Sequence, residues 1–426
     1  MIFYEKETFI GLLLASLPAI LSVYFFFILE KKRIALFLLL SSAFLVRILM
    51  ISLDPYVHEW DERFHALVAK NMTLYPFKPM LFVNHIMAYN YADWGYNHIW
   101  VHKQPLFLWQ MALSMKVFGI NTFALRLPSA IMGTIMIWLI YDISRKWVLD
   151  DKVAFIAAFM AAFANYALEL TSGWISLDHN DMAFVFYMTC SFWAFTKYIS
   201  SNHSIKWAIL IGVFSGLAIL NKWLVGLLIF GGWGLYLLYS EYRLEVKKYA
   251  HLGIGVIVSG IVFIPWQLYI LKAFPLEAAI AFEGNRKHMT EDLGHPGNAF
   301  FHLKFLTTAY HVFLVCFLVI GLIWIFKMKI ANRKLTIPFL AMIVVIFSFF
   351  SLFVTTKMPA FVYPVSSLLF VIMSVGVYSL CSLGFNYLNL ISRHKNQLFA
   401  IVTLLVGFYS LTPAAIIELR GGGVTP

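Results

Sequence analysis

Apolar runs long enough to cross a lipid bilayer recur along this chain. A helix needs about 20 apolar residues to span the hydrocarbon core. Of the 426 residues, 61% are hydrophobic and only 12% are charged, which leaves too little polar surface for a water-soluble protein of this size. We therefore predict an all-α polytopic membrane protein with about 12 transmembrane helices, near residues 9–29, 34–53, 122–142, 152–170, 180–198, 207–220, 223–240, 249–271, 305–326, 336–355, 360–382 and 397–416.

Short basic clusters between these runs predict the topology. They fall at every second connection, at residues 31–33, 145–146, 243–248, 327–334 and 393–395. The positive-inside rule makes those connections cytoplasmic. The net charge of +11 is then a topology signal, and we expect no nucleic-acid partner.

The alternate connections include two long segments, residues 54–121 and 272–304, which this topology places on the non-cytoplasmic face. Within the first, residues 62–72 have helical spacing and residues 105–118 read as an apolar-faced helix lying in the membrane interface. We expect one transmembrane domain over residues 1–416, a short tail at 417–426, no cleaved signal peptide and no sizeable soluble C-terminal domain.

Acids, cations and imidazoles gather at these outer connections. Asp61 and Glu62 form an acidic pair beside Arg63, a composition suited to a general base, although a solvated loop would look the same. Lys103 lies where the chain returns to the membrane and could meet a lipid phosphate, or simply snorkel to the interface. Asp178 and Asp181 lie at the mouth of a span, where unpartnered acids cost free energy.

Weaker candidates follow further along the chain. They are Lys222 in a two-helix turn, Arg286 and His295 in the second long segment, and Lys357 with Tyr363 near the outer end of a late span. A purely structural role for all of these polar residues on one face is hard to defend.

Together, these motifs resemble the membrane-embedded C-type (GT-C) glycosyltransferases, in the branch of protein O-mannosyltransferases and bacterial aminoarabinose transferases of lipid A. The resemblance runs from about Leu53 to about Pro364, with the motifs in the same order. Its most specific part is Lys-Gln-Pro-Leu at 103–106, continuing to Arg-Leu-Pro-Ser-Ala at 126–130. Asp-Glu at 61–62 and Gly-Leu-Ala-Ile-Leu-Asn-Lys at 216–222 are similar to two further family motifs.

The resemblance implies transfer of a sugar, with inversion, from a polyprenyl-phosphate donor to a lipid, glycan or protein acceptor at the outer face of a bacterial plasma membrane. Asp61 would be the base beside Glu62, and Asp181 or Asp178 a second acidic site. Donor and phosphate contacts would come from Lys103, Arg63, Lys222, Arg286, Lys357 and Tyr363.

Three positions depart from the family pattern. His65 replaces an aromatic hydroxyl, and Trp223 replaces a glycine. His102 stands where aminoarabinose transferases carry a metal-binding Glu. The resemblance thus implies a divalent ion (zinc, manganese or magnesium) at His102 and His295 only if imidazoles replace that ligand.

Other classes of protein remain open. A transporter or flippase would suit the helix number, but no internal repeat is evident and few ionisable residues fall at mid-membrane depth. A ligase or polymerase of lipid-linked glycans would need an Arg- and His-rich loop rather than this series of motifs. A non-catalytic scaffold would not explain the acids at the membrane edge.

Overall fold

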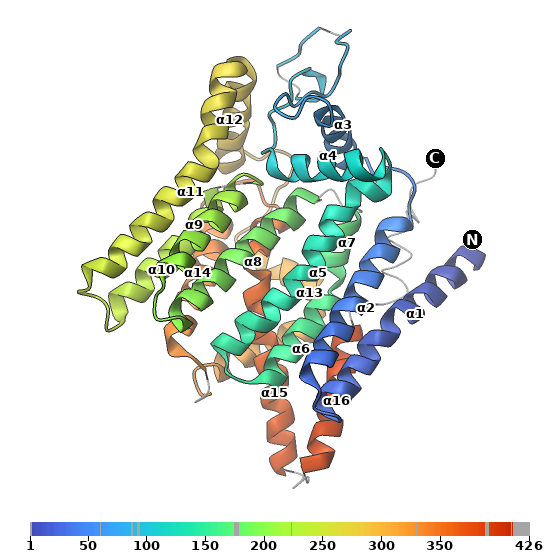
Figure 1. Ribbon diagram of the computed structural model, residues 1–426, viewed down its shortest axis with the longest axis vertical. Coiled ribbons are helices and arrows are strands. Elements are labelled where there is room, and N and C mark those ends of the chain that lie inside the picture. The colour runs from blue at the N-terminus through green and yellow to red at the C-terminus, as the bar shows by residue number, and fades with distance from the viewer. Residues whose placement is uncertain are drawn as a thin grey trace.

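The computed structural model describes residues 2–59, 61–86, 88–91, 94–173, 179–222, 224–328, 331–387, 392–409 and 411. These described residues form a bundle of helices with one isolated β-bridge, between Met80 and Ile99. Figure 1 shows most helices running roughly side by side, with α3, α4 and α12 gathered at one end. We call this the site end. The predicted all-α membrane architecture is confirmed.

Seven described helices are long and apolar enough to cross a membrane, or eight if one bent pair counts as a single span. The seven are α1 (Ile2–Phe27), α2 (Lys32–Ser52), α5 (Thr122–Trp147), α11 (Val246–Ala273), α13 (Phe301–Trp324), α14 (Arg333–Leu352) and α15 (Ser366–Tyr387). The remaining predicted spans correspond to α8 (His179–Ser200), α9 (Ile205–Ile219), η2 (Leu224–Leu227) with α10 (Leu228–Tyr239), and α16 (Ser392–Phe408). The number of about 12 spans therefore stays a prediction.

The bent pair differs from the single helix predicted at 152–170. It consists of α6 (Asp151–Ala162) and α7 (Asn165–Ser172), which meet at 45°. The break contains neither Pro nor Gly. Instead, Arg47 of α2 donates from Nη1 to the carbonyl oxygen of Ala162, at 3.0 Å. A cation from a neighbouring helix thus satisfies a carbonyl at the end of α6.

The site end contains both helices predicted in the first outer segment, α3 (Asp61–Met72) and α4 (Leu106–Phe118). In Figure 1, α4 lies across the ends of the membrane helices. The second outer segment, read from the sequence only as a long connection, contains α12 (Pro275–Thr290), which begins directly after α11.

Two glycines bring α9 and α11 together and so place the turn that follows α9. An added Cβ would lie 2.9 Å from Val258 Cβ at Gly212 and 2.8 Å from the Ser259 carbonyl oxygen at Gly216. Small residues at this spacing allow membrane helices to pack closely. The turn is also fixed to the start of α4, because Leu106 N–H donates to the carbonyl oxygen of Leu220 at 3.0 Å.

Candidate active site

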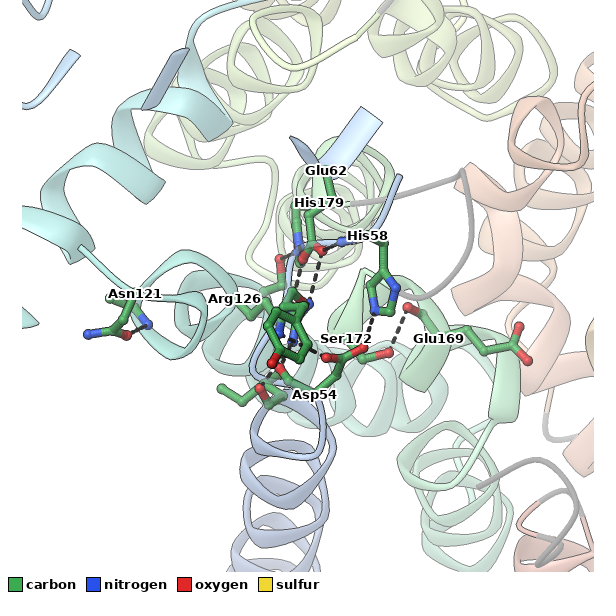
Figure 2. A network of polar contacts seen from close by, with 12 residues as sticks. Asp54, His58, Glu62, Asn121, Arg126, Glu169, Ser172 and His179 are labelled. Atoms are coloured by element: carbon green, nitrogen blue, oxygen red, sulfur yellow. Dashed lines mark hydrogen bonds and ion pairs between the residues drawn. The ribbon is translucent and has the colours of Figure 1, made fainter. Parts of the chain in front are cut away.

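The start of α3 is fixed by a buried network around Glu62. Arg126 of α5 donates to both carboxylate oxygens, with Nε 2.7 Å from Oε1 and Nη2 2.9 Å from Oε2. His179 Nε2 lies 3.0 Å from Oε1, and the backbone N–H of His58 donates to Oε2 at 2.7 Å. Figure 2 shows these groups converging. All four contacts serve to hold the carboxylate in place.

Asp61, one residue earlier, is directed to a different partner. Its Oδ2 lies 3.3 Å from Nζ of Lys103, in the segment before α4. Burial favours the neutral carboxyl group, but the charge of Lys103, with smaller contributions from His65 and His102, lowers the pKa of Asp61 to about 2. Asp61 is therefore ionised at neutral pH.

A second acid–lysine pair lies close by. Asp181, in the first turn of α8, is buried and forms an ion pair with Lys222, in the turn after α9. The helix N-terminus also favours the negative charge of Asp181. The ammonium group of Lys222 lies 6.0 Å from the centre of the Phe361 ring.

Both ion pairs line one small polar pocket of about 70 Å³. It collects residues from α3, the segment before α4, the start of α8, the turn after α9, and α12. The lining residues are Asp61, His102, Lys103, Gln104, Asn180, Asp181, Asn221, Lys222, Asn285, His288, Met358 and Phe361. Five predicted residues from distant parts of the sequence (Asp61, His102, Lys103, Asp181 and Lys222) are thus brought together.

A much larger apolar groove of about 970 Å³ adjoins this pocket. Its walls come from α10, α11, α12 and α14, and most of its lining side chains are aliphatic or aromatic. Four residues line both spaces: Gln104, Lys222, Asn285 and Phe361. Gln267 Nε2 of α11 donates to Gln104 Oε1 at 2.8 Å where the two spaces meet. The arrangement suits a ligand with a charged end and a long apolar tail.

Two predicted cations lie outside the polar pocket. Arg63 is exposed, and its guanidinium group lies 5.4 Å from the centre of the Phe64 ring. Arg286 lines the apolar groove and is paired with Glu283, its Nε lying 2.8 Å from Oε2. Of these two, only Arg286 could contact a ligand bound in the groove.

Lys357 and Tyr363 make structural contacts rather than facing the polar pocket or the apolar groove. Nζ of Lys357 donates to the carbonyl oxygens of Phe350 at 3.0 Å and Ser351 at 2.9 Å, and also to that of Val354, so it caps the end of α14. Tyr363 is 1% exposed and packs between aromatic rings of neighbouring helices. Neither residue lines the polar pocket or the apolar groove.

The two candidate metal ligands are placed differently. His102 lines the polar pocket, and burial, with the charge of Lys103, lowers its pKa to about 3, so its imidazole is neutral at neutral pH. His295 is exposed, and its carbonyl oxygen accepts from the backbone N–H of Lys357. Within the part of the chain that the structure describes, no three His, Cys, Asp or Glu residues are arranged to hold a metal ion. Asp178, the alternative acid, lies outside the described residues.

Several pocket residues were not predicted from the sequence. Asn285 and His288 are three residues apart on α12 and line the pocket together. Burial lowers the pKa of His288. Helical spacing in the second outer segment could have identified this pair, whereas Asn180 and Asn221 carry no signal beyond adjacency to Asp181 and Lys222.

Comparison with known proteins bears on this arrangement. The family model for dolichyl-phosphate-mannose-protein mannosyltransferase matches residues 102–269. The crystal structure of ArnT from Cupriavidus metallidurans in the apo state superposes with a TM-score of 0.66, at 17% identity, over 91% of this chain and 77% of that one. The chain has the GT-C fold. Its resemblance to the mannosyltransferase and aminoarabinose transferase branch is confirmed.

Two further similarities concern related proteins. ArnT from the same organism bound to undecaprenyl phosphate superposes with a TM-score of 0.62, at 17% identity, over 90% of this chain and 73% of that one. An undecaprenyl phosphate-alpha-4-amino-4-deoxy-L-arabinose arabinosyl transferase from Pseudomonas savastanoi is 24% identical over 180 residues, 41% of this chain and 32% of the relative. The matches to curated relatives span between about a third and about a half of the relatives' length.

Proposed function

We propose that this protein is an inverting glycosyltransferase that moves a sugar from a polyprenyl-phosphate donor to an acceptor hydroxyl or amine. The observation that carries the proposal is the junction of the 970 Å³ apolar groove with the polar pocket that contains Asp61 and Asp181. A polyprenyl chain would occupy the groove, and the phosphate and sugar would enter the pocket.

The phosphate would meet a set of cations at the junction. Lys222 lines both spaces, Lys103 lines the pocket and Arg286 lines the groove. An ammonium group near a phosphate in a partly dry cavity interacts more strongly than it would in water. These groups would stabilise the negative charge that grows on the departing polyprenyl phosphate.

The acceptor would be activated by a carboxylate. Asp61 takes the proton from the acceptor O–H or N–H, the acceptor atom bonds to the anomeric carbon, and the bond from that carbon to the phosphate oxygen breaks on the opposite side. Asp181 would orient the acceptor or share the role of base. No step is assigned to the divalent ion predicted at His102 and His295, because the described residues gather too few donors for it.

The proposed setting is the outer face of a bacterial plasma membrane. The basic clusters that predict the cytoplasmic side lie at connections away from the site end, which supports that orientation.

The test is release of polyprenyl phosphate by the purified protein from a panel of polyprenyl-phosphate sugars. Wild-type protein should release it from at least one donor, and Asp61→Asn should reduce turnover by about 10²-fold or more. Glu291→Gln is the matched control, because this acid is exposed and lies outside the pocket. Absence of release with every donor, combined with movement of a lipid or solute across vesicles, would establish the transporter or flippase instead.

A further inference from the structure

His179 connects the two helices that carry the candidate acids. Its Nε2 lies 3.0 Å from Oε1 of Glu62, the residue next to Asp61. His179 itself lies two residues before Asp181. Its Nδ1 lies 2.9 Å from Oγ of Ser129 in α5. Because an ionised carboxylate only accepts hydrogen bonds, Nε2 carries a proton and donates to Glu62, while Nδ1 shares a hydrogen bond with the Ser129 hydroxyl.

The order Ser129, His179, Glu62 would suit a nucleophile, a base and an orienting acid, but burial excludes that chemistry. The three residues are each 1% exposed, and none of them lines the polar pocket. A substrate carbonyl or anomeric carbon has no access to the Ser129 hydroxyl. The chain of hydrogen bonds therefore acts by holding groups in position.

The backbone at Gly173 leaves room for this link. Gly173, which ends α7, has a φ of +71°. A Cβ there would lie 2.8 Å from His179 Nε2 and 2.8 Å from Glu62 Cδ. Any larger residue would press on both members of the hydrogen bond, so this glycine is required by a close approach as well as by its left-handed conformation.

We propose that His179 is a positioning residue that fixes the separation of Asp61 and Asp181 through its hydrogen bonds to Glu62 and Ser129. The inference rests on the proposed glycosyl transfer. Figure 2 shows His179 and Arg126 both directed at Glu62. Arg126 fastens α3 to α5 and to the carbonyl oxygens of Asp54 and Tyr56, whereas His179 fastens it to α8, which carries the second acid.

Two substitutions separate the two hydrogen bonds of the imidazole. In His179→Gln, the amide N–H stands near the place of Nε2 and still donates to Glu62. In His179→Asn, the shorter amide stands near the place of Nδ1 and reaches only Ser129. We expect Asn to lower kcat by about 10²-fold, the effect of a small misplacement of reacting groups, and Gln to stay within about tenfold of wild type. KM for the polyprenyl-phosphate donor should stay within about twofold in both, because the groove and Lys222 are untouched.

A merely structural role would lower the yield of folded protein equally in both variants and leave turnover per folded molecule unchanged. Equal kcat values for Gln and Asn, or a rise in KM that accounts for the loss, would overturn the proposal. Ser129→Ala provides a third variant that keeps the bond to Glu62 and should lower kcat less than His179→Asn.

Hydrogen exchange supplies a readout that does not depend on activity. Amides at the starts of α3 and α8 should exchange faster in His179→Asn than in His179→Gln, while those of α4 stay unchanged. If wild-type protein transfers no sugar, the proposed function fails. The exchange rates then still test whether His179 joins α3 to α8. Equal exchange in the two variants would show that His179 does not join the two helices.

Discussion

Nζ of Lys103 lies 3.3 Å from Oδ2 of Asp61, so the candidate base and a candidate phosphate contact form an ion pair with each other. A phosphate that attracts Lys103 would weaken this pair and make Asp61 a stronger base. In the proposed reaction, binding of the donor would thus prepare Asp61 to accept a proton from the acceptor.

The first prediction concerns pH. Burial raises the pKa of Asp61 and Lys103 lowers it, with a net value of about 2. In Lys103→Gln the opposing charge is lost, so the pKa rises and the acidic limb of the kcat/KM profile should move to higher pH by about 1 to 3 pH units. Lys103→Arg keeps the charge and should keep the limb in place. Superimposable limbs in the two variants would contradict this assignment.

A second prediction concerns the buried ion pair of Glu62 and Arg126, which are 1% and 0% exposed. Arg126→Met leaves a buried carboxylate without its cation, and should lower the free energy of unfolding in detergent by about 3 to 5 kcal/mol. Arg63→Met removes an exposed cation from α3, the helix of Glu62, and should change the free energy of unfolding by less than about 0.5 kcal/mol. Equal losses would mean that the Glu62 network does not stabilise the fold.

The same pair predicts how stability depends on acid. Burial opposes the charge of Glu62, but hydrogen bonds from Arg126 and His179 lower its pKa from 4.5 to about 2. The stabilisation is fully present above about pH 4.5 and is lost as the pH falls toward about 2. Glu62→Gln should show a smaller loss across that window than wild type, measured by unfolding at each pH.

A fourth prediction separates two lysines that the sequence treats alike. Lys222→Met removes a charge at the junction of groove and pocket, and should raise KM for the donor by roughly 10- to 100-fold. Lys357→Met removes the cap of α14, and should destabilise the fold by about 1.5 to 3 kcal/mol while KM stays within about twofold. The opposite pattern would restore Lys357 as a phosphate contact.

The fifth prediction concerns the apolar groove. Gly231 lines it, and no atom of another helix lies within 4 Å of an added Cβ. Gly231→Leu should fill part of the groove and raise KM for a long-chain donor by about tenfold, equivalent to the burial of one or two methylene groups. Gly253→Leu is the matched control, in open space on α11 outside the groove. A short-chain donor should respond to neither change.

Much of this organisation could be predicted because it depends on local pattern. Apolar runs locate most helices. The helix predicted at 62–72 is α3, and its apolar residues recur at helical spacing because one face of the helix is buried. Asp61 and Lys103 could be identified from their motifs. The polar pocket that unites them with Asp181 and Lys222 depends on packing between α3, α4, α8 and α9.

The remaining features depend on partners distant in sequence. The break at Ala162 is completed by Arg47 of another helix, so the sequence from 152 to 170 shows no interruption. A lysine just beyond a helix can cap it or bind an anion equally well, and only the carbonyl groups around Lys357 decide between these roles. The predicted metal site needed His102 and His295 to lie close together, and the spacing of two residues in separate loops does not predict their distance in space.

The walls of the apolar groove include Leu224, 62% exposed, and Val345, 54% exposed. In a membrane these exposed apolar side chains would face lipid, so the proposed polyprenyl donor would enter the groove laterally without passing through water. The effective concentration of such a donor is its mole fraction in the lipid. Adding inert phospholipid at constant donor should slow turnover by surface dilution, whereas adding buffer to the same vesicles should not.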